Sequence, residues 1–326
     1  MTPLLNIMRA LADPTRLRIT LLIRQLELSV SEVVQILGQS QPRVSRHIKI
    51  LDEAGIAERR REGAWVFLRP GPMLSNAAIA PLFGLAGTED SRAVLRDLER
   101  LKEVRAARTE MAAAYFDAHA AEWDSIRSLH IAEAEVETAM RAILGEATLG
   151  RVLDIGTGTG RMVELFAQQA ERFVALDNSV EMLRLARAKL AGMAGAAAVQ
   201  GHTEIVLGDF NALPFADGSF DTILLHQVLH YAQHPETAIA EAARVLAPEG
   251  RLMVVDFASH DLEELRSVHA HARLGFSDES MNRAFAGAGL VPAQTETLAG
   301  GKLAVKIWLG QRGQAETQAP NLRIVA

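Results

Sequence analysis

The chain has 326 residues, of which 49% are hydrophobic and 23% are charged, which is ordinary for a globular protein long enough for two domains. No apolar run approaches the ~18 residues that a membrane span needs, and the N-terminus lacks the pattern of a secretory signal. We therefore expect a cytoplasmic protein with no membrane partner. The chain contains no cysteine, which excludes chemistry that depends on a protein thiolate.

The net charge of −6 is spread unevenly along the chain. Residues 1–70 hold 11 basic against 7 acidic residues, whereas the remainder holds 23 against 33. A basic segment on an otherwise acidic chain is typical of a region that binds a polyanion such as DNA. Charge alone does not separate this interpretation from an incidental difference between domains.

The chain opens with two predicted helices. Leu4, Met8 and Leu11 have the spacing of one apolar helix face, which predicts a short amphipathic helix. Asp13, followed directly by a proline, predicts the N-cap of a second helix over residues 14–26.

Two further helices follow and are joined by a short turn. Ser29 and Glu32 are spaced as a capping box, and Gly38 predicts the end of that helix. A fourth helix is predicted to begin after Ser40 and to end at Gly55. Two helices joined in this way predict a helix-turn-helix.

The fourth helix has two different faces. Val44, Ile48 and Leu51 are predicted to point into the core, and His47 between the faces is predicted to be a half-buried packing residue. The other face is polar and basic, and suits a DNA major groove because such side chains donate to base edges and phosphates. The candidate DNA-contacting residues of this helix are Gln41, Arg43, Ser45, Arg46 and Lys49.

A two-stranded hairpin is predicted next, over residues 57–61 and 64–68. Arg59, Arg60 and Arg61 lie along its first strand. Three arginines on a strand are consistent with a solvated edge, but beside a helix-turn-helix we interpret them as phosphate contacts.

Three separated segments, residues 11–19, 40–48 and 54–63, together resemble the ArsR-type winged-helix repressors. The resemblance implies a homodimer that binds a double-stranded DNA operator and places two recognition helices in major grooves ~34 Å apart. Many members sense metals through cysteines, and the lack of cysteine rules out thiolate metal sensing here.

A connector follows the hairpin. Residues 70–72, Pro-Gly-Pro, mark a boundary, and residues 73–86 predict a helix at the dimer interface. Residues 89–123 predict one long helix rich in alanine and charged residues. Its aromatic end contains Tyr115.

The second half of the chain alternates strands and helices. A strand over 151–155 leads into a glycine loop over 156–160 and a helix over 161–169, which together build a nucleotide-type site. A second strand ends at Asp177, whose carboxylate is placed to accept both ribose hydroxyl protons. This second strand covers 172–176, and further strands are predicted over 204–207, 220–225 and 250–255, so we expect an α/β doubly wound parallel sheet.

A dinucleotide site expects G-x-G-x-x-G, whereas this loop is D-x-G-x-G-x-G. Residues 110–312 instead resemble the class I S-adenosylmethionine-dependent methyltransferases, in their ubiquinone-biosynthesis-like small-molecule branch. The resemblance implies a Rossmann-like sheet of seven strands, closed by an antiparallel pair over 294–298 and 303–309.

The same resemblance assigns the cofactor residues. The glycine loop would hold the methionine part of S-adenosylmethionine, Asp177 the ribose, and an Asp-Phe pair the adenine. S-adenosylhomocysteine would bind as product or effector. The candidate cofactor residues are Tyr115, Asp154, Gly156, Thr157, Gly158, Gly160, Asp177, Asn178, Met182, Asp209, Phe210 and His226.

Three histidines are spaced by four: His226, His230 and His234. A metal site would need them on one helix, but His226 is predicted at a strand end and Pro235 interrupts a continuous helix, so we predict no metal. His226 and His230 are the candidates for a general base.

The predicted domains are a winged helix (1–70), a helical connector and dimerisation region (71–145), a methyltransferase domain (146–312) and a polar tail (313–326). Two functions stay open. One is a transcriptional regulator whose operator binding follows the cofactor; the other is an active methyltransferase on a small-molecule acceptor, with the winged helix serving autoregulation. A winged helix used only for dimerisation is disfavoured by its polar helix face.

Overall fold

In a computed structural model of the protein, the described residues are 3–62, 65–74, 92–123, 133–192, 199, 201–300 and 303–313. The chain divides into two units, Met1–Tyr115 with His260–Leu274, and Phe116–Ser259 with Gly275–Ala326. The predicted connector is therefore divided between the units. The helix predicted over 73–86 and the tail predicted over 313–326 lie almost wholly outside the described residues. None of the described helices combines the length and the apolarity that a membrane span requires.

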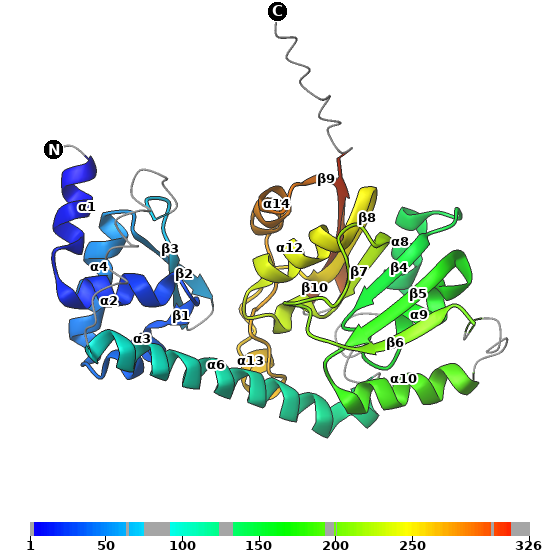
Figure 1. Cartoon of the computed structure of the whole chain (residues 1–326), viewed down its shortest axis with the longest axis horizontal. Helices are drawn as coiled ribbons and strands as arrows, with labels where there is room; N and C mark the ends of the chain where they lie inside the picture. Colours follow the sequence, from blue (N-terminus) through cyan, green and yellow to red (C-terminus); the bar gives the residue numbers. More distant parts are fainter. Residues whose placement is uncertain are drawn as a thin grey trace, which may run out of the picture. The chain divides into compact units, whose positions relative to one another are not determined.

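The first unit is a winged helix-turn-helix, as the sequence predicts (Figure 1). Its elements are α1 (Pro3–Leu11), α2 (Pro14–Ile23), β1 (Leu28–Ser29), α3 (Val30–Leu37), α4 (Gln41–Glu53), β2 (Ala57–Glu62), β3 (Trp65–Pro70), most of α6 (Arg92–His119) and α13 (Glu264–Val268). The three strands form an antiparallel sheet in the order β1-β3-β2.

Local caps determine where these helices begin and end. The carboxylate of Asp13 accepts the backbone N–H groups of Thr15 and Arg16 at 2.9 and 3.1 Å, so α2 begins there. Ser29 and Glu32 form the predicted capping box at the start of α3. Gly38 ends α3 at a φ of 63°, a left-handed conformation that favours glycine. The turn between α3 and α4 is thereby fixed.

Helix α1 is present, but its buried face differs from the predicted one. Ile7 and Ala10 are each 3% exposed, whereas Leu4 and Met8 are 54% and 44% exposed. Periodicity did not decide between the two faces because apolar residues lie on both. The first unit therefore presents apolar side chains of α1 to its surroundings.

The second unit contains the predicted seven-stranded sheet, with helices between its strands (Figure 1). Its strands are β4 (Gly150–Ile155), β5 (Ala170–Asp177), β6 (Thr203–Leu207), β7 (Phe220–His226), β8 (Leu246–Phe257), β9 (Leu290–Gly300) and β10 (Leu303–Arg312). Its helices are η1 (Ala120–Glu122), α8 (Glu133–Leu144), α9 (Arg161–Phe166), η2 (Ala167–Gln169), α10 (Val180–Gly192), η3 (Leu229–Tyr231), α12 (Pro235–Val245) and α14 (Asp278–Gly287).

The strand order is β6-β5-β4-β7-β8-β10-β9, with the first five strands parallel and the last two antiparallel to their neighbours. From β4 the chain moves outward to β5 and β6, and from β7 it moves the opposite way to β8. Right-handed crossovers then place the connecting helices on opposite faces of the sheet. The order reverses between β4 and β7, and the carboxyl ends of strands at such a reversal are where ligands bind in sheets of this kind.

The middle of the sheet carries the core of the second unit. Leu153, Val174 and Ile223 are fully buried in adjacent strands and belong to one apolar cluster with α12 and α14. This rigid core supports the ends of β4, β5 and β7, where the candidate site lies.

Leu153→Ala should lower the free energy of unfolding of the second unit by about 2–5 kcal/mol, because it removes a fully buried side chain and leaves a cavity. Leu207→Ala is the matched control, since Leu207 lies on the edge strand β6 and is 56% exposed. Denaturant unfolding measures both. Equal losses for the two variants would contradict the assigned core.

Candidate functional site

Helix α4 presents an uninterrupted polar face to solvent. Val44, Ile48 and Leu51 are at most 2% exposed and hold the helix on the core of the first unit. The five residues predicted to contact DNA are all exposed: Gln41, Arg43, Ser45, Arg46 and Lys49. His47 is half-buried, with Nδ1 3.7 Å from Asp13 Oδ1, and burial holds the pKa of its imidazole below the ordinary value.

The three arginines of the hairpin have different surroundings. Arg59 is exposed and contacts Asp52 at 2.8 Å, and Arg61 is exposed. Arg60 instead turns to Glu27 at 2.9 Å, because neighbouring residues of a strand point to opposite faces. Arg59 and Arg61 therefore stay candidates for phosphate contact, whereas Arg60 is engaged inside the first unit.

A groove lies between α4 and the hairpin. It is lined by residues of the α3 N-terminus, of α4 and of both hairpin strands: Ser29, Val30, Ser31, Gln41, Ser45, Ile48, Arg59, Trp65 and Val66. Three predicted DNA-contacting residues, Gln41 and Ser45 of α4 and Arg59 of the hairpin, thus line one concave surface.

In the second unit, the loop after β4 turns in a way that requires glycine. Gly156, Gly158 and Gly160 have φ values of 75°, 54° and 86°. A side chain at Gly156 would meet Val228, with Cβ atoms only 2.8 Å apart. The loop is fixed by the carbonyl of Leu176, which accepts the N–H groups of Gly156 and Thr157 at 2.8 and 2.9 Å. Its backbone is therefore open for close approach by a ligand.

Asp177, at the end of β5, lies beside this loop and is only 9% exposed. Its Oδ2 accepts the N–H of Gly158 at 2.8 Å, and its Oδ1 accepts the N–H of Ser179 at 2.9 Å. Burial raises the pKa of this carboxyl above its ordinary value, although the backbone N–H groups of Ser179, Gly158 and Asn178 oppose the rise. These backbone N–H groups occupy only part of the roughly four acceptor positions of a carboxylate, so it is suited to accept ligand hydroxyls.

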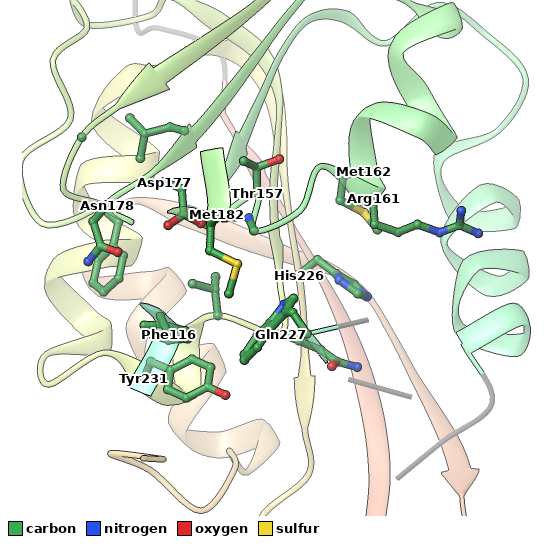
Figure 2. A pocket seen from close by; sticks show the side chains of 17 residues that line it. Phe116, Thr157, Arg161, Met162, Asp177, Asn178, Met182, His226, Gln227 and Tyr231 are labelled. Carbon is green, nitrogen blue, oxygen red and sulfur yellow. Dashed lines mark hydrogen bonds between the residues drawn. The ribbon is translucent and has the colours of Figure 1, made fainter. Parts of the chain in front are cut away.

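Loop and carboxylate open into one partly enclosed pocket of about 690 Å³ (Figure 2). Eight of the predicted cofactor residues line it: Gly156, Thr157, Gly158, Asp177, Asn178, Met182, Phe210 and His226. Nine lining residues were not predicted: Phe116, Trp123, Arg161, Met162, Leu176, Gly208, Gln227, Val228 and Tyr231.

An aromatic cluster forms one wall of this pocket. Phe116 packs on Tyr231 with ring centroids 4.7 Å apart, and on Trp123 at 5.4 Å. Trp123 also lies over the glycine loop, since a Cβ at Gly158 would be 3.3 Å from its indole nitrogen. Figure 2 shows the rings of Phe116 and Tyr231 next to each other.

Four predicted cofactor residues do not line the pocket. The Tyr115 hydroxyl lies 2.7 Å from Nδ1 of His269 in the first unit, and the next residue, about 100° further round the helix, lines the pocket instead. Asp154 is fully buried, and Gly160 caps α9. Asp209 is exposed and accepts both amide groups of Asn211 in a local turn.

The histidines have separate settings, as their sequence context predicts. His226 ends β7 and lines the pocket, while His234 is the N-cap of α12. His230 is 2% exposed, and its Nδ1 lies 2.8 Å from Oδ1 of the fully buried Asp256. Among the described residues no cluster of side chains is arranged to hold a metal ion.

Gln227, next to His226, was missed by sequence reasoning. It has a φ of 51°, in the left-handed region that non-glycine residues rarely adopt, and its N–H donates to Val255 at 2.7 Å. Such strain is concentrated at functional positions. The residues around Gln227 give no signal for this conformation, whereas Phe116 and Trp123 lie in the same aromatic segment as the predicted Tyr115.

Comparison with known proteins assigns both regions. Residues 13–59 match the family described as bacterial regulatory protein, arsR family, and residues 153–254 match the family described as methyltransferase domain. The chain therefore carries an arsR-type helix-turn-helix domain followed by a methyltransferase domain, which confirms the two resemblances of the sequence.

Individual relatives match part of the chain. A demethylmenaquinone methyltransferase of Renibacterium salmoninarum is 34% identical over 134 residues, 41% of this chain and 51% of that protein. The ubiquinone/menaquinone biosynthesis C-methyltransferase UbiE of Pseudomonas savastanoi pv. phaseolicola is 35% identical over 117 residues, 35% of this chain and 44% of that protein. The chain thus spans about half the length of the curated relatives it matches.

A solved structure shows the same fold. A chain of the complex between the Haloferax volcanii Trm112 methyltransferase activator and a methyltransferase superposes with a TM-score of 0.50 at 22% identity. The match covers 61% of this chain and 98% of that one.

Removing Asp256 should destabilise the second unit far more than removing His226. Asp256→Ala leaves the buried His230 without its carboxylate and should cost on the order of 3 kcal/mol of unfolding free energy. His226→Ala, at the pocket wall, should stay within about 1 kcal/mol of the parent chain. Thermal and denaturant unfolding measure both, and comparable losses would contradict the structural role given to His230.

Proposed function

We propose that this protein is a DNA-binding transcriptional regulator whose methyltransferase domain binds S-adenosylmethionine or S-adenosylhomocysteine and couples cofactor status to operator affinity. The observation that carries the proposal is the pairing, in one chain, of an exposed polar α4 face with a glycine-lined pocket around Asp177. A ligand pocket joined to a DNA-binding unit regulates it when the ligand binds differently in the two states.

The pocket residues fit S-adenosylmethionine. The buried Asp177 carboxylate has acceptor positions suited to two ribose hydroxyls, and the left-handed glycines leave the loop backbone open to the methionine part. Met182 and Phe210 supply apolar surface for the adenine ring. S-adenosylhomocysteine would use the same residues, as product or as effector.

The first unit fits a homodimer on a double-stranded operator. The polar face of α4 would enter the major groove, while Arg59 and Arg61 of the hairpin meet phosphates. The exposed Leu4 and Met8 of α1 supply apolar surface that a second copy of the chain would cover. A dimer would present two recognition helices to successive grooves.

A second candidate function is methyl transfer to a small-molecule acceptor. It is favoured by His226, a titratable group on the pocket wall, beside the strained Gln227 and the aromatic cluster. The cofactor, when bound, supplies an activated methyl group. His226 would take a proton from the acceptor, and Phe116, Trp123 and Tyr231 would exclude water.

The double variant Arg46→Ala with Lys49→Ala should weaken operator binding by at least about tenfold, because each lost side chain removes a base or phosphate contact. Gel shifts with selected DNA at fixed salt measure the affinity. The matched control is Lys102→Ala with Arg283→Ala, which removes two exposed cations from other helices. A double variant that binds as tightly as the control would contradict the assigned DNA face.

Asp177→Ala should weaken S-adenosylmethionine binding by at least about tenfold, since it removes the acceptor for the ribose hydroxyls. Asp217→Ala is the control, because the Asp217 side chain is 77% exposed and pairs with Arg244. Calorimetric titration of both variants decides the assignment. Equal affinities of the two variants would contradict the assignment of Asp177, at the end of β5, to the ribose hydroxyls.

The two candidate functions are separated by two assays on the full chain. A gel shift titrated with each cofactor form tests regulation, and operator affinity that ignores both forms contradicts it. Turnover of labelled S-adenosylmethionine with a metabolite extract tests catalysis. A labelled product that is lost in His226→Ala would support the enzyme, and no product across a broad panel would count against it.

A further inference from the structure

One segment of the chain belongs to a different unit from the residues before and after it. His260–Leu274 lies between β8 and α14, two elements of the sheet, yet it belongs to the first unit together with the winged helix. We refer to it as the strap, and to β2 with β3 as the wing. The strap contains the short helix α13 and leaves at Gly275, whose φ is 75°.

A buried charge cluster joins the strap to the wing. Arg273 of the strap contacts Oε2 of Glu27 at 2.5 Å, and Arg60 of β2 contacts Oε1 of the same carboxylate at 2.9 Å. The side chains of Glu27 and Arg273 are only 12% and 7% exposed. Burial alone raises the pKa of Glu27, but the two guanidinium groups outweigh it and hold that pKa below its ordinary value. Glu27 therefore carries its negative charge between the two guanidinium groups at neutral pH.

A second contact is made by a residue nearer the start of the strap. The guanidinium of Arg266 stacks over the rings of Phe67 and Trp65 in β3, at 5.1 and 6.0 Å from their centroids. It is held in place by a hydrogen bond of 2.8 Å to the carbonyl of Ala272 in the same strap. The strap thus contacts β3 directly through Arg266, whereas it is joined to Arg60 of β2 only through the carboxylate of Glu27, which Arg60 and Arg273 both contact.

The strap is attached to the pocket side by a short stretch of β8. Gln227 of the pocket wall donates its N–H to Val255 at 2.7 Å, five residues before the strap begins. The base of the strap is pinned on the sheet, since Phe276 bonds to Phe257 at 2.9 Å and accepts from Ser259 at 3.1 Å. A side chain at Gly275 would lie 2.8 Å from the carbonyl of Phe257, so the exit of the strap is equally constrained.

We propose that the strap His260–Leu274 holds the wing in its DNA-binding position and transmits the occupancy of the pocket to it. The proposal deepens the proposed function and rests on it. The charge cluster reaches the wing at Arg60, which contacts Glu27 and lies on β2 between the exposed Arg59 and Arg61. A shift of the strap that moves Arg273 would move Glu27, which Arg60 also contacts. The orientation of Arg59 and Arg61 would change with it.

Hydrogen exchange on the full chain, without cofactor or DNA, tests whether the strap holds the wing in position. Arg273→Gln removes the charge and keeps most of the side chain, so exchange should rise at least about tenfold in the strap and in the wing. Arg273→Lys keeps the charge and should restore much of the protection. The control Arg283→Gln removes an exposed cation of α14 that pairs with Glu279 and should leave both segments unchanged. Unchanged exchange in the wing of Arg273→Gln would overturn the proposal.

Operator affinity with and without S-adenosylmethionine tests the transmission. The ratio of the two affinities should fall toward one in Arg273→Gln, while its affinity for S-adenosylmethionine stays that of the parent chain. A parent chain whose DNA affinity ignores the cofactor contradicts the proposed function. A cofactor-sensitive parent whose ratio survives in Arg273→Gln contradicts the strap alone. Glu27→Gln repeats the test from the other partner, and an unfolding scan of each variant shows that the fold is retained.

Discussion

The pocket depends on one contact, the hydrogen bond from the Gly158 N–H to the buried Asp177 carboxylate. It joins the loop after β4 to the end of β5, so two strands of the sheet determine the backbone shape that a ligand meets. Burial raises the pKa of this carboxyl, and the backbone N–H groups that face it oppose the rise. The left-handed glycines make the contact possible, since a side chain at Gly156 would meet Val228.

Much of this arrangement follows from local sequence. The glycine loop after a buried strand, and an acidic residue at the end of the next strand, specify the pocket because sheet topology brings strand ends together. The capping box of Ser29 and Glu32 and the turn at Gly38 likewise specify the helix-turn-helix from short-range hydrogen bonds. These features depend on residues near each other along the chain.

Features that depend on distant contacts were not predictable. Tyr115 and Phe116 carry the same aromatic signal, and only the packing of α6 decides that Phe116 lines the pocket. Arg60 belongs to a row of three arginines, and its pairing with Glu27 depends on a strand face that the sequence does not identify. The strap depends even less on local sequence, because Glu27, the partner of Arg273, lies more than two hundred residues earlier in the chain.

In the proposed function, the binding of cofactor changes the free energy of operator binding. Because such coupling is reciprocal, operator DNA must change the affinity for the cofactor by the same factor. The most direct measurement is the affinity of the full chain for S-adenosylmethionine, titrated with and without saturating operator DNA at one salt concentration. The account predicts two different affinities, whose ratio equals the effect of cofactor on DNA binding. Identical affinities with and without DNA would contradict it.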